Sequence, residues 1–284
     1  MCRHLAYLGP PVTLAALLFD PPYSLARQSW APRDMRGGGT INADGFGIGW
    51  YGGGAEPVRY RRACPLWTDP TLPALAAVTV SGAVLAAVRS ATVGMPVTET
   101  GAAPFGEGPW LFSLNGVVRG WPDSIAALAG ELPTRDLLTL DAPTDAAALW
   151  ALVRHRLRAG APPVDAVAGT VRAVAAAAPG SRLNVLLTDG RTVVASAAGH
   201  ALSVRTTSGS VLVCSEPLDE GPGWRPVPDG HLVVAIADHL DTWSLGLDTV
   251  AMAPESPPTG SGSPPTGSES RPTESESRVM GDDG

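Results

Sequence analysis

Short apolar runs, each bounded by glycine or aspartate, recur along the chain. They are rich in valine and leucine and too short for typical helices, a pattern that predicts β-strands. The predicted strands are RHLAYLG (3–9), GFGIGWY (45–51), AVLAAVR (83–89), WLFSLNG (110–116), RLNVLLTD (182–189), RTVVASAA (191–198), SVLVCS (210–215) and HLVVAIAD (231–238).

Two longer stretches have a helical pattern instead, DAAALWALVRHRLRAG at 145–160 and VDAVAGTVRAVAAAA at 164–178. Thr144 or Asp145 can cap the start of the first helix, because each has a side-chain oxygen for the unpaired amides there. Gly160 can end it.

The order of these elements predicts an α+β domain with layered, largely antiparallel sheets. The first half of the chain alternates element types, and the second half is rich in strands. Within it, LNVLLTDGRTVVASA predicts a β-hairpin with Asp189-Gly190 at the turn. A Rossmann fold fits poorly, because no GxGxxG motif leads from a strand into a helix.

The composition changes near Ala253. The following PESPPTGSGSPPTGSESRPTESESR consists almost entirely of Pro, Ser, Thr, Gly and charged residues. Such a segment cannot bury enough apolar surface to offset the entropy lost on ordering. We therefore predict a folded domain at 2–252 and a disordered, solubilising tail at 253–284.

Charge and cysteine content exclude several classes of protein. The 284 residues carry a net charge of -7 with no block of Lys or Arg, which argues against a nucleic-acid or anionic-membrane partner. Cys2, Cys64 and Cys214 form no CxxC motif, and the histidines have no metal-ligand spacing, so we expect no disulfide framework and no metal. Without a membrane span or signal peptide, the chain is predicted to be a reduced, cytoplasmic protein.

Cys2 directly follows the initiator methionine. Removal of Met1 would leave one residue with both a thiol and a free α-amine. An α-amine titrates near ~8, so it can act as the base that a thiol nucleophile needs. The alternative is that Cys2 is only a small apolar residue at the start of a strand. His4 alternates with Cys2 along that strand, and we interpret it as a hydrogen-bonded core residue.

Asn115-Gly116 follows the apolar run WLFSL. Taken alone, Asn-Gly most often forms the tight turn of a β-hairpin. The functional alternative is an oxyanion hole, in which the Asn115 amide and the Gly116 N–H stabilise the negative oxygen of a tetrahedral intermediate.

Arg89 ends the strand AVLAAV, and Asp145 begins the first long helix. A guanidinium at such a strand end usually reaches solvent, but it can also bind a carboxylate through two parallel hydrogen bonds. Asp145 can be a helix cap or the partner of a substrate ammonium. Together, Arg89 and Asp145 could bind the two charged groups of an α-amino acid, with Thr92 as a further donor.

The motifs MCRHLAYLG, NADGFGIGWY, RSATVGMP, FSLNGVV and PTDAAALW, in this order, resemble the class II glutamine amidotransferase domain of the N-terminal-nucleophile hydrolases. The resemblance implies a four-layer αββα sandwich with two antiparallel sheets between helical layers. It makes Cys2 the nucleophile, with its α-amine as base. Asn115 and Gly116 match the oxyanion hole, while Arg89, Thr92 and Asp145 match the residues that bind the glutamyl group.

Further stretches, including LFDPPYSLARQSWAPR and EPLDEGPGWRPVPDGHLV, resemble the stand-alone ergothioneine-pathway branch of this family. That resemblance implies hydrolysis of a γ-glutamyl amide in a small-molecule substrate through a γ-glutamyl thioester, without a cofactor. Leu114 departs from the histidine that many relatives have before Asn-Gly. Two alternatives stay open: a glutaminase subunit that delivers ammonia to a synthase, and a catalytically silent binding protein. The oligomeric state is also open, a homo-oligomer included.

Overall fold

The computed structural model describes residues 2–35 and 41–247. Within these residues two antiparallel sheets face each other. The first has the strand order β11-β9-β10-β1-β4-β2-β3, and the second has the order β13-β12-β8-β7-β6-β5. The strands are β1 (Arg3–Thr13), β2 (Phe46–Trp50), β3 (Val58–Arg62), β4 (Val80–Val88), β5 (Phe105–Glu107), β6 (Trp110–Val117), β7 (Arg182–Thr188), β8 (Val193–Ala197), β9 (Ser203–Thr207), β10 (Ser210–Cys214), β11 (Trp224–Pro226), β12 (His231–Ile236) and β13 (His239–Ser244).

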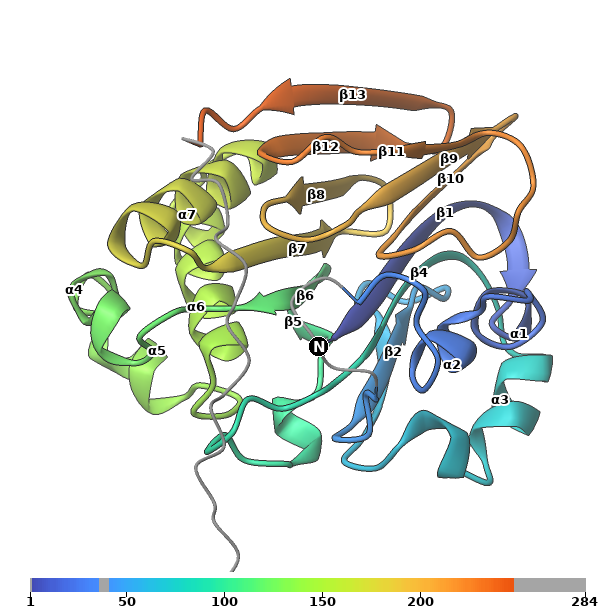
Figure 1. The fold of residues 1–284 in the computed structure, drawn as a ribbon, viewed down its shortest axis with the longest axis horizontal. Coiled ribbons are helices and arrows are strands. Elements are labelled where there is room, and N and C mark those ends of the chain that lie inside the picture. The colour runs from blue at the N-terminus through green and yellow to red at the C-terminus, as the bar shows by residue number, and fades with distance from the viewer. Residues whose placement is uncertain (1, 36–40, 248–284) are drawn as a thin grey trace, which may run out of the picture. The chain divides into compact units, whose positions relative to one another are not determined.

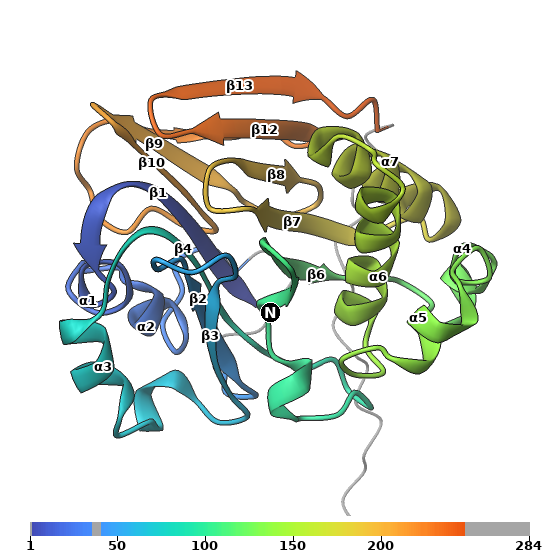
Figure 2. The same ribbon diagram turned by 180° about the vertical axis from the view of Figure 1, so that it is seen from behind.

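Helices cover the outer faces of both sheets (Figures 1 and 2). Three short helices pack on the first sheet, and the two long helices pack on the second. The α-helices are α1 (Ala15–Leu18), α2 (Leu25–Gln28), α3 (Leu72–Val78), α4 (Ala126–Ala129), α5 (Thr134–Leu138), α6 (Asp145–Arg158) and α7 (Pro163–Ala177). The arrangement is the four-layer αββα sandwich predicted from the resemblance.

Three apolar layers hold the sandwich together, and β1 shows why its sequence is almost continuously apolar. Leu5 and Tyr7 pack into the layer beneath α1–α3. Ala6 and Leu8 point the other way, into the layer between the two sheets. A third layer lies between the second sheet and α6 and α7. Because both faces of the central strands are buried, alternation between apolar and polar residues disappears there.

Each strand predicted from an apolar run is present, and the β7–β8 hairpin is confirmed with Gly190 at a φ of 84°. Thr144 is the N-cap of α6, since its hydroxyl accepts a hydrogen bond from the Ala147 N–H at 3.2 Å. Strands β3 and β13 were not predicted, because VRYRR and HLDTWS are polar segments at sheet edges.

The glycine-rich segment GFGIGWY, predicted to be a strand, contains β2. A side chain at Gly47 would collide with the Ala103 carbonyl, and one at Gly49 would collide with the Leu111 side chain. The glycines of this strand therefore permit close contact with the second sheet and its connecting loop.

The fold places the ends of several elements around Cys2. Arg3 is paired with Val88, so Cys2 lies beside the segment that follows β4. No helix among the described residues is long and apolar enough to cross a membrane. The predicted tail at 253–284 lies outside the described residues.

Candidate active site

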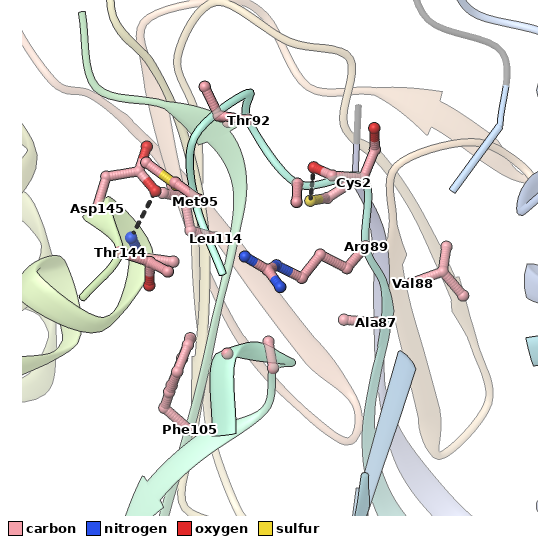
Figure 3. Close-up of a pocket in the computed structure, with 16 residues that line it drawn as sticks. Cys2, Ala87, Val88, Arg89, Thr92, Met95, Phe105, Leu114, Thr144 and Asp145 are labelled. Carbon is pink, nitrogen blue, oxygen red and sulfur yellow. Dashed lines mark hydrogen bonds between the residues drawn. The ribbon is translucent and has the colours of Figure 1, made fainter. Parts of the chain in front are cut away.

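Cys2 lines a pocket that is partly open to solvent. The thiol is partly buried and donates a long hydrogen bond to the Ser90 carbonyl oxygen, with 3.8 Å between sulfur and oxygen. Five parts of the fold line the pocket: Cys2 before β1, the end of β4 with the segment that follows it, the segment at 101–105 that leads into β5, strand β6, and the first turn of α6. Residues far apart in sequence thus converge on the thiol (Figure 3).

Arg89 extends into this pocket from the end of β4 (Figure 3). The residue is only 8% exposed, and its Nη1 donates to the Pro96 carbonyl oxygen at 2.8 Å. A Cβ at Gly101 would lie 3.1 Å from Nη1, so glycine leaves room for the guanidinium. No carboxylate of residues 2–35 and 41–247 pairs with Arg89. A buried cation without an anion is costly, and a bound carboxylate would relieve that cost.

Asp145 lies on the opposite side of the same pocket (Figure 3). It is 5% exposed and accepts hydrogen bonds from the Val118 and Ala146 N–H groups at 2.9 and 2.8 Å. Burial raises the pKa of this carboxyl, and these two bonds and the nearby Arg89 charge oppose the rise. Its place at the start of α6 also favours a negative charge. Arg89 and Asp145 therefore present opposite charges to one cavity.

Asn115 and Gly116 lie inside β6 and pair with Asn184 and Leu183 of β7. The interpretation of Asn-Gly as a hairpin turn is therefore wrong. A side chain at Gly116 would overlap the Arg182 carbonyl oxygen, so the close approach of β7 requires glycine whatever its chemical role. Gly116 lines the pocket.

The Asn115 side chain is 1% exposed and donates from Nδ2 to the Ser215 Oγ at 3.1 Å. Its Oδ1 has no hydrogen-bond partner within the described part of the chain. An amide nitrogen carries two hydrogens, so the bond to Ser215 leaves one for another acceptor. Asn115 itself is not among the described residues that line the pocket, whereas Cys2, Arg89, Thr92 and Asp145 are.

Thr92 stands at the exposed rim of the pocket. Its carbonyl oxygen accepts a hydrogen bond from the Met95 N–H at 2.9 Å, which closes a turn. The structure therefore brings Thr92 to the same cavity as Arg89, but on its outer edge.

Ser215 is a residue of the site that the sequence did not single out. Its hydroxyl accepts from the His4 N–H at 3.0 Å as well as from Asn115, and it donates to the His4 carbonyl oxygen at 3.3 Å. Ser215 follows β10, the neighbour of β1, so it joins the strand that follows Cys2 to β6 of the other sheet. Only the pairing of β1 with β10 could have revealed it.

His4 is buried, as predicted for a core residue, but its hydrogen bonding is incomplete. Nδ1 lies 2.8 Å from the Ser113 Oγ, and Nε2 has no partner within the described residues. Burial, followed by the charges of His200 and Arg3, lowers the pKa of His4 to about 3. The ring is therefore neutral at physiological pH.

Several proteins of known name are similar to this chain in sequence. No protein-family model matches it. A γ-glutamyl-hercynylcysteine sulfoxide hydrolase from Mycolicibacterium smegmatis is 40% identical over 233 residues, which cover 82% of this chain and 95% of the relative. One from Mycobacterium tuberculosis is 41% identical over 234 residues, which cover 82% and 92%. The chain belongs to the γ-glutamyl-hercynylcysteine sulfoxide hydrolase family.

Solved structures place this hydrolase family within a wider fold. A glutamine aminotransferase class-II domain protein from Silicibacter pomeroyi has a TM-score of 0.62 and 23% identity, covering 86% of this chain and 99% of the other. The glutamine phosphoribosylpyrophosphate amidotransferase of Bacillus subtilis has a TM-score of 0.62 and 14% identity, covering 87% of this chain and 50% of that protein. At these identities the similarity shows the fold alone.

Proposed function

We propose that this protein hydrolyses γ-glutamyl-hercynylcysteine sulfoxide to glutamate and hercynylcysteine sulfoxide, with Cys2 as nucleophile. The relatives named for this reaction support the substrate, because they match along nearly their whole length. The observation that carries the chemistry is that Cys2, Arg89 and Asp145 line one pocket. A thiol, a cation and an anion are what the cleavage of a γ-glutamyl amide needs.

The two charged residues define the end of the substrate that is recognised. The α-carboxylate of the glutamyl group binds Arg89, which has no anionic partner within residues 2–35 and 41–247. The α-ammonium binds Asp145, and Thr92 adds a donor at the rim. Fixing both groups holds the γ-carbonyl near the thiol, so attack becomes effectively intramolecular.

Removal of Met1 creates the base. The Cys2 α-amine takes the thiol proton, and the sulfur forms a bond to the γ-carbonyl carbon. The electron pair of the C=O bond moves to oxygen, and the Gly116 N–H and the second amide hydrogen of Asn115 stabilise this oxyanion. Two such donors lower the barrier by about 3 kcal/mol or more each.

Collapse of this intermediate breaks the C–N bond. The α-ammonium gives its proton to the leaving nitrogen, and a γ-glutamyl thioester on Cys2 remains. The α-amine then takes a proton from water, whose oxygen attacks the thioester carbonyl. Glutamate leaves and the proton returns to sulfur, so that each turnover consumes one water and restores the thiol.

The test is glutamate release by the protein alone, after mass spectrometry has shown that Met1 is absent. Wild type and Cys2→Ala are each given γ-glutamyl-hercynylcysteine sulfoxide and, separately, glutamine. We expect rapid release from the sulfoxide, little from glutamine, and loss of at least ~10³-fold in Cys2→Ala. A folded Cys2→Ala variant of near wild-type rate contradicts the nucleophile assignment.

Other results select the alternatives. Release from glutamine alone favours a glutaminase subunit that delivers ammonia to a separate synthase. Release from neither substrate, with Cys2 confirmed as the first residue, favours a catalytically silent binding protein. A retained Met1 excludes the α-amine as base.

A further inference from the structure

Directly behind the nucleophile lies a buried ion pair that the proposed reaction does not use. The Arg3 Nε donates to the Glu216 Oε1 at 2.7 Å, and the two side chains are 2% and 4% exposed. The guanidinium also donates from Nη1 to the Cys2 carbonyl oxygen at 3.0 Å and from Nη2 to the Asp34 carbonyl oxygen. Arg3 thus bonds to one carboxylate and two backbone oxygens.

Stability alone is a weak explanation for this arrangement. Removing two charges from water costs several kcal/mol per ion, and an apolar pair of similar volume is often as stable or more so. The pair does, however, directly contact Cys2, and its orientation is itself fixed. The second carboxylate oxygen of Glu216 accepts a hydrogen bond from the Arg33 N–H at 2.8 Å. The backbone carbonyl oxygen of Glu216 accepts one from the Cys214 thiol at 2.9 Å.

A terminal nucleophile needs such an anchor more than an internal one does. Strand β1 begins at Arg3, and the first residue that the ladder pairs is Arg3 with Val88. Once Met1 is removed, Cys2 has a single peptide bond. Rotation of the peptide plane between Cys2 and Arg3 then moves the α-amine and the thiol together relative to the pocket. The carbonyl oxygen of Cys2 lies in that plane, and its hydrogen bond from Arg3 restrains the rotation.

We propose that Arg3 is a positioning residue for the reaction: with Glu216, it fixes the peptide plane between Cys2 and Arg3, and thereby the position from which the thiol and α-amine reach the scissile carbonyl. This inference rests on the proposed role of Cys2 as a terminal nucleophile. Arg3 touches no reacting atom, and recognition of the glutamyl group by Arg89 and Asp145 does not depend on it.

The test is the double variant Arg3→Met/Glu216→Leu. Changing both residues leaves no unpaired buried charge, so the domain is expected to fold with a similar melting temperature. Misplacement of the reacting groups by about 1 Å costs on the order of 10²-fold in rate. We therefore expect kcat to fall ~10²-fold while KM changes less than ~3-fold, because the loss lies in the transition state.

The matched control is Arg154→Met. Arg154 is 8% exposed and pairs with Asp136 and Glu107, and none of these three is among the described residues that line the pocket. It is expected to keep the wild-type kcat even if its stability falls. Should the double variant not fold, Arg3→Lys serves instead, since one ammonium keeps the charge but cannot bind both backbone oxygens in the planar geometry of a guanidinium.

A second readout needs no substrate. Iodoacetamide alkylates Cys2, and the mass of the N-terminal peptide gives the rate at pH 7 separately from Cys64 and Cys214. We expect the rate of the double variant to differ at least ~3-fold from wild type and from Arg154→Met, because the thiol is no longer held in one position relative to the pocket. If wild type cleaves no γ-glutamyl substrate, the proposed function fails while this readout still judges the positioning. A folded double variant with wild-type kcat and alkylation rate overturns the inference.

Discussion

The pocket has two ends, the proposed recognition end and the proposed nucleophile end, and they are built in opposite ways. At the recognition end, Arg89 and Asp145 are charged side chains that face the cavity and are held mainly by backbone groups. At the nucleophile end, the residues that support Cys2 lie behind it. There, Arg3 pairs with Glu216, and Ser215 bonds to both His4 and Asn115.

The two ends differ in whether the ligand or the protein itself supplies the partners of their polar groups. The recognition end leaves buried charge to be completed by the ligand, and this favours binding at some cost to the stability of the empty protein. The nucleophile end is largely completed by the protein itself, so its geometry exists before substrate arrives. Substitutions at the first end should therefore act on KM, and those at the second on kcat.

Arg89→Met should give the largest effect on recognition. The variant removes the only guanidinium of the described residues that lines the pocket. Loss of one partner from a buried charge pair costs about 2–5 kcal/mol, which corresponds to a fall in kcat/KM of ~30- to ~4,000-fold. The fall should appear mostly as a raised KM in steady-state kinetics with the γ-glutamyl substrate.

Arg61→Met is the matched control for that variant. Arg61 hydrogen-bonds to the carbonyl oxygens of Thr100 and Ala102 and pairs with Asp141, so it touches the same connecting segment from outside the pocket. We expect its KM to stay within ~2-fold of wild type. An unchanged KM in Arg89→Met would remove Arg89 from carboxylate binding.

Ser215→Ala tests the nucleophile end. The Asn115 amide would lose the hydroxyl that orients it, while the amide itself stays available to the oxyanion. Removing an oxyanion donor outright costs ~10²–10³-fold in kcat, so loss of its support should cost about 10-fold, with KM nearly unchanged. Ser113→Ala is the control, because Ser113 bonds to the His4 ring and not to Asn115. Equal kinetics in the two variants would show that Ser215 does not act through Asn115.

The same contrast explains what sequence patterns could predict. Arg89 and Asp145 stand at the end of a predicted strand and the start of a predicted helix, so local periodicity places them. The partners of Arg3 and His4 are Glu216 and Ser215, more than 200 positions away, and they meet only because β10 lies next to β1. Strand order in a sheet is a nonlocal property that apolar runs do not encode. The interpretation of Asn115-Gly116 as a turn was wrong for the same reason, because the pairing of β6 with β7 overrides the local turn preference.

His4 gives the nucleophile end a measurable dependence of stability on pH. Its pKa is lowered to about 3 in the folded protein, chiefly by burial, with His200 and Arg3 the charged groups nearby. An unfolded histidine titrates near ~6.5, so between these values the unfolded chain binds the extra proton. Stability is thus complete above about pH 6.5 and falls as the pH decreases, by about 1.4 kcal/mol per pH unit from this residue. Urea unfolding at pH 6, 5 and 4 should show a steeper loss in wild type than in His4→Phe. Parallel curves would mean that His4 does not remain neutral in the fold.

Thr92→Val should give the smallest effect, and it marks the outer limit of the recognition end. Thr92 is exposed at the rim, and its turn uses the backbone carbonyl, which valine retains. The change removes one hydroxyl from a wet surface, where a hydrogen bond contributes about 0.5–1.5 kcal/mol. KM should therefore rise ~2–10-fold at constant kcat and constant melting temperature. Thr98→Val provides a contrast. The Thr98 hydroxyl accepts a hydrogen bond from the Gly101 N–H, and Gly101 lies next to the Arg89 guanidinium. In that variant we therefore expect a raised KM together with a lower melting temperature. If Thr92→Val leaves KM unchanged, only the two buried charges, Arg89 and Asp145, recognise the glutamyl group. If kcat/KM falls as far as it does in Arg89→Met, Thr92 at the rim contributes as much to recognition as the buried arginine.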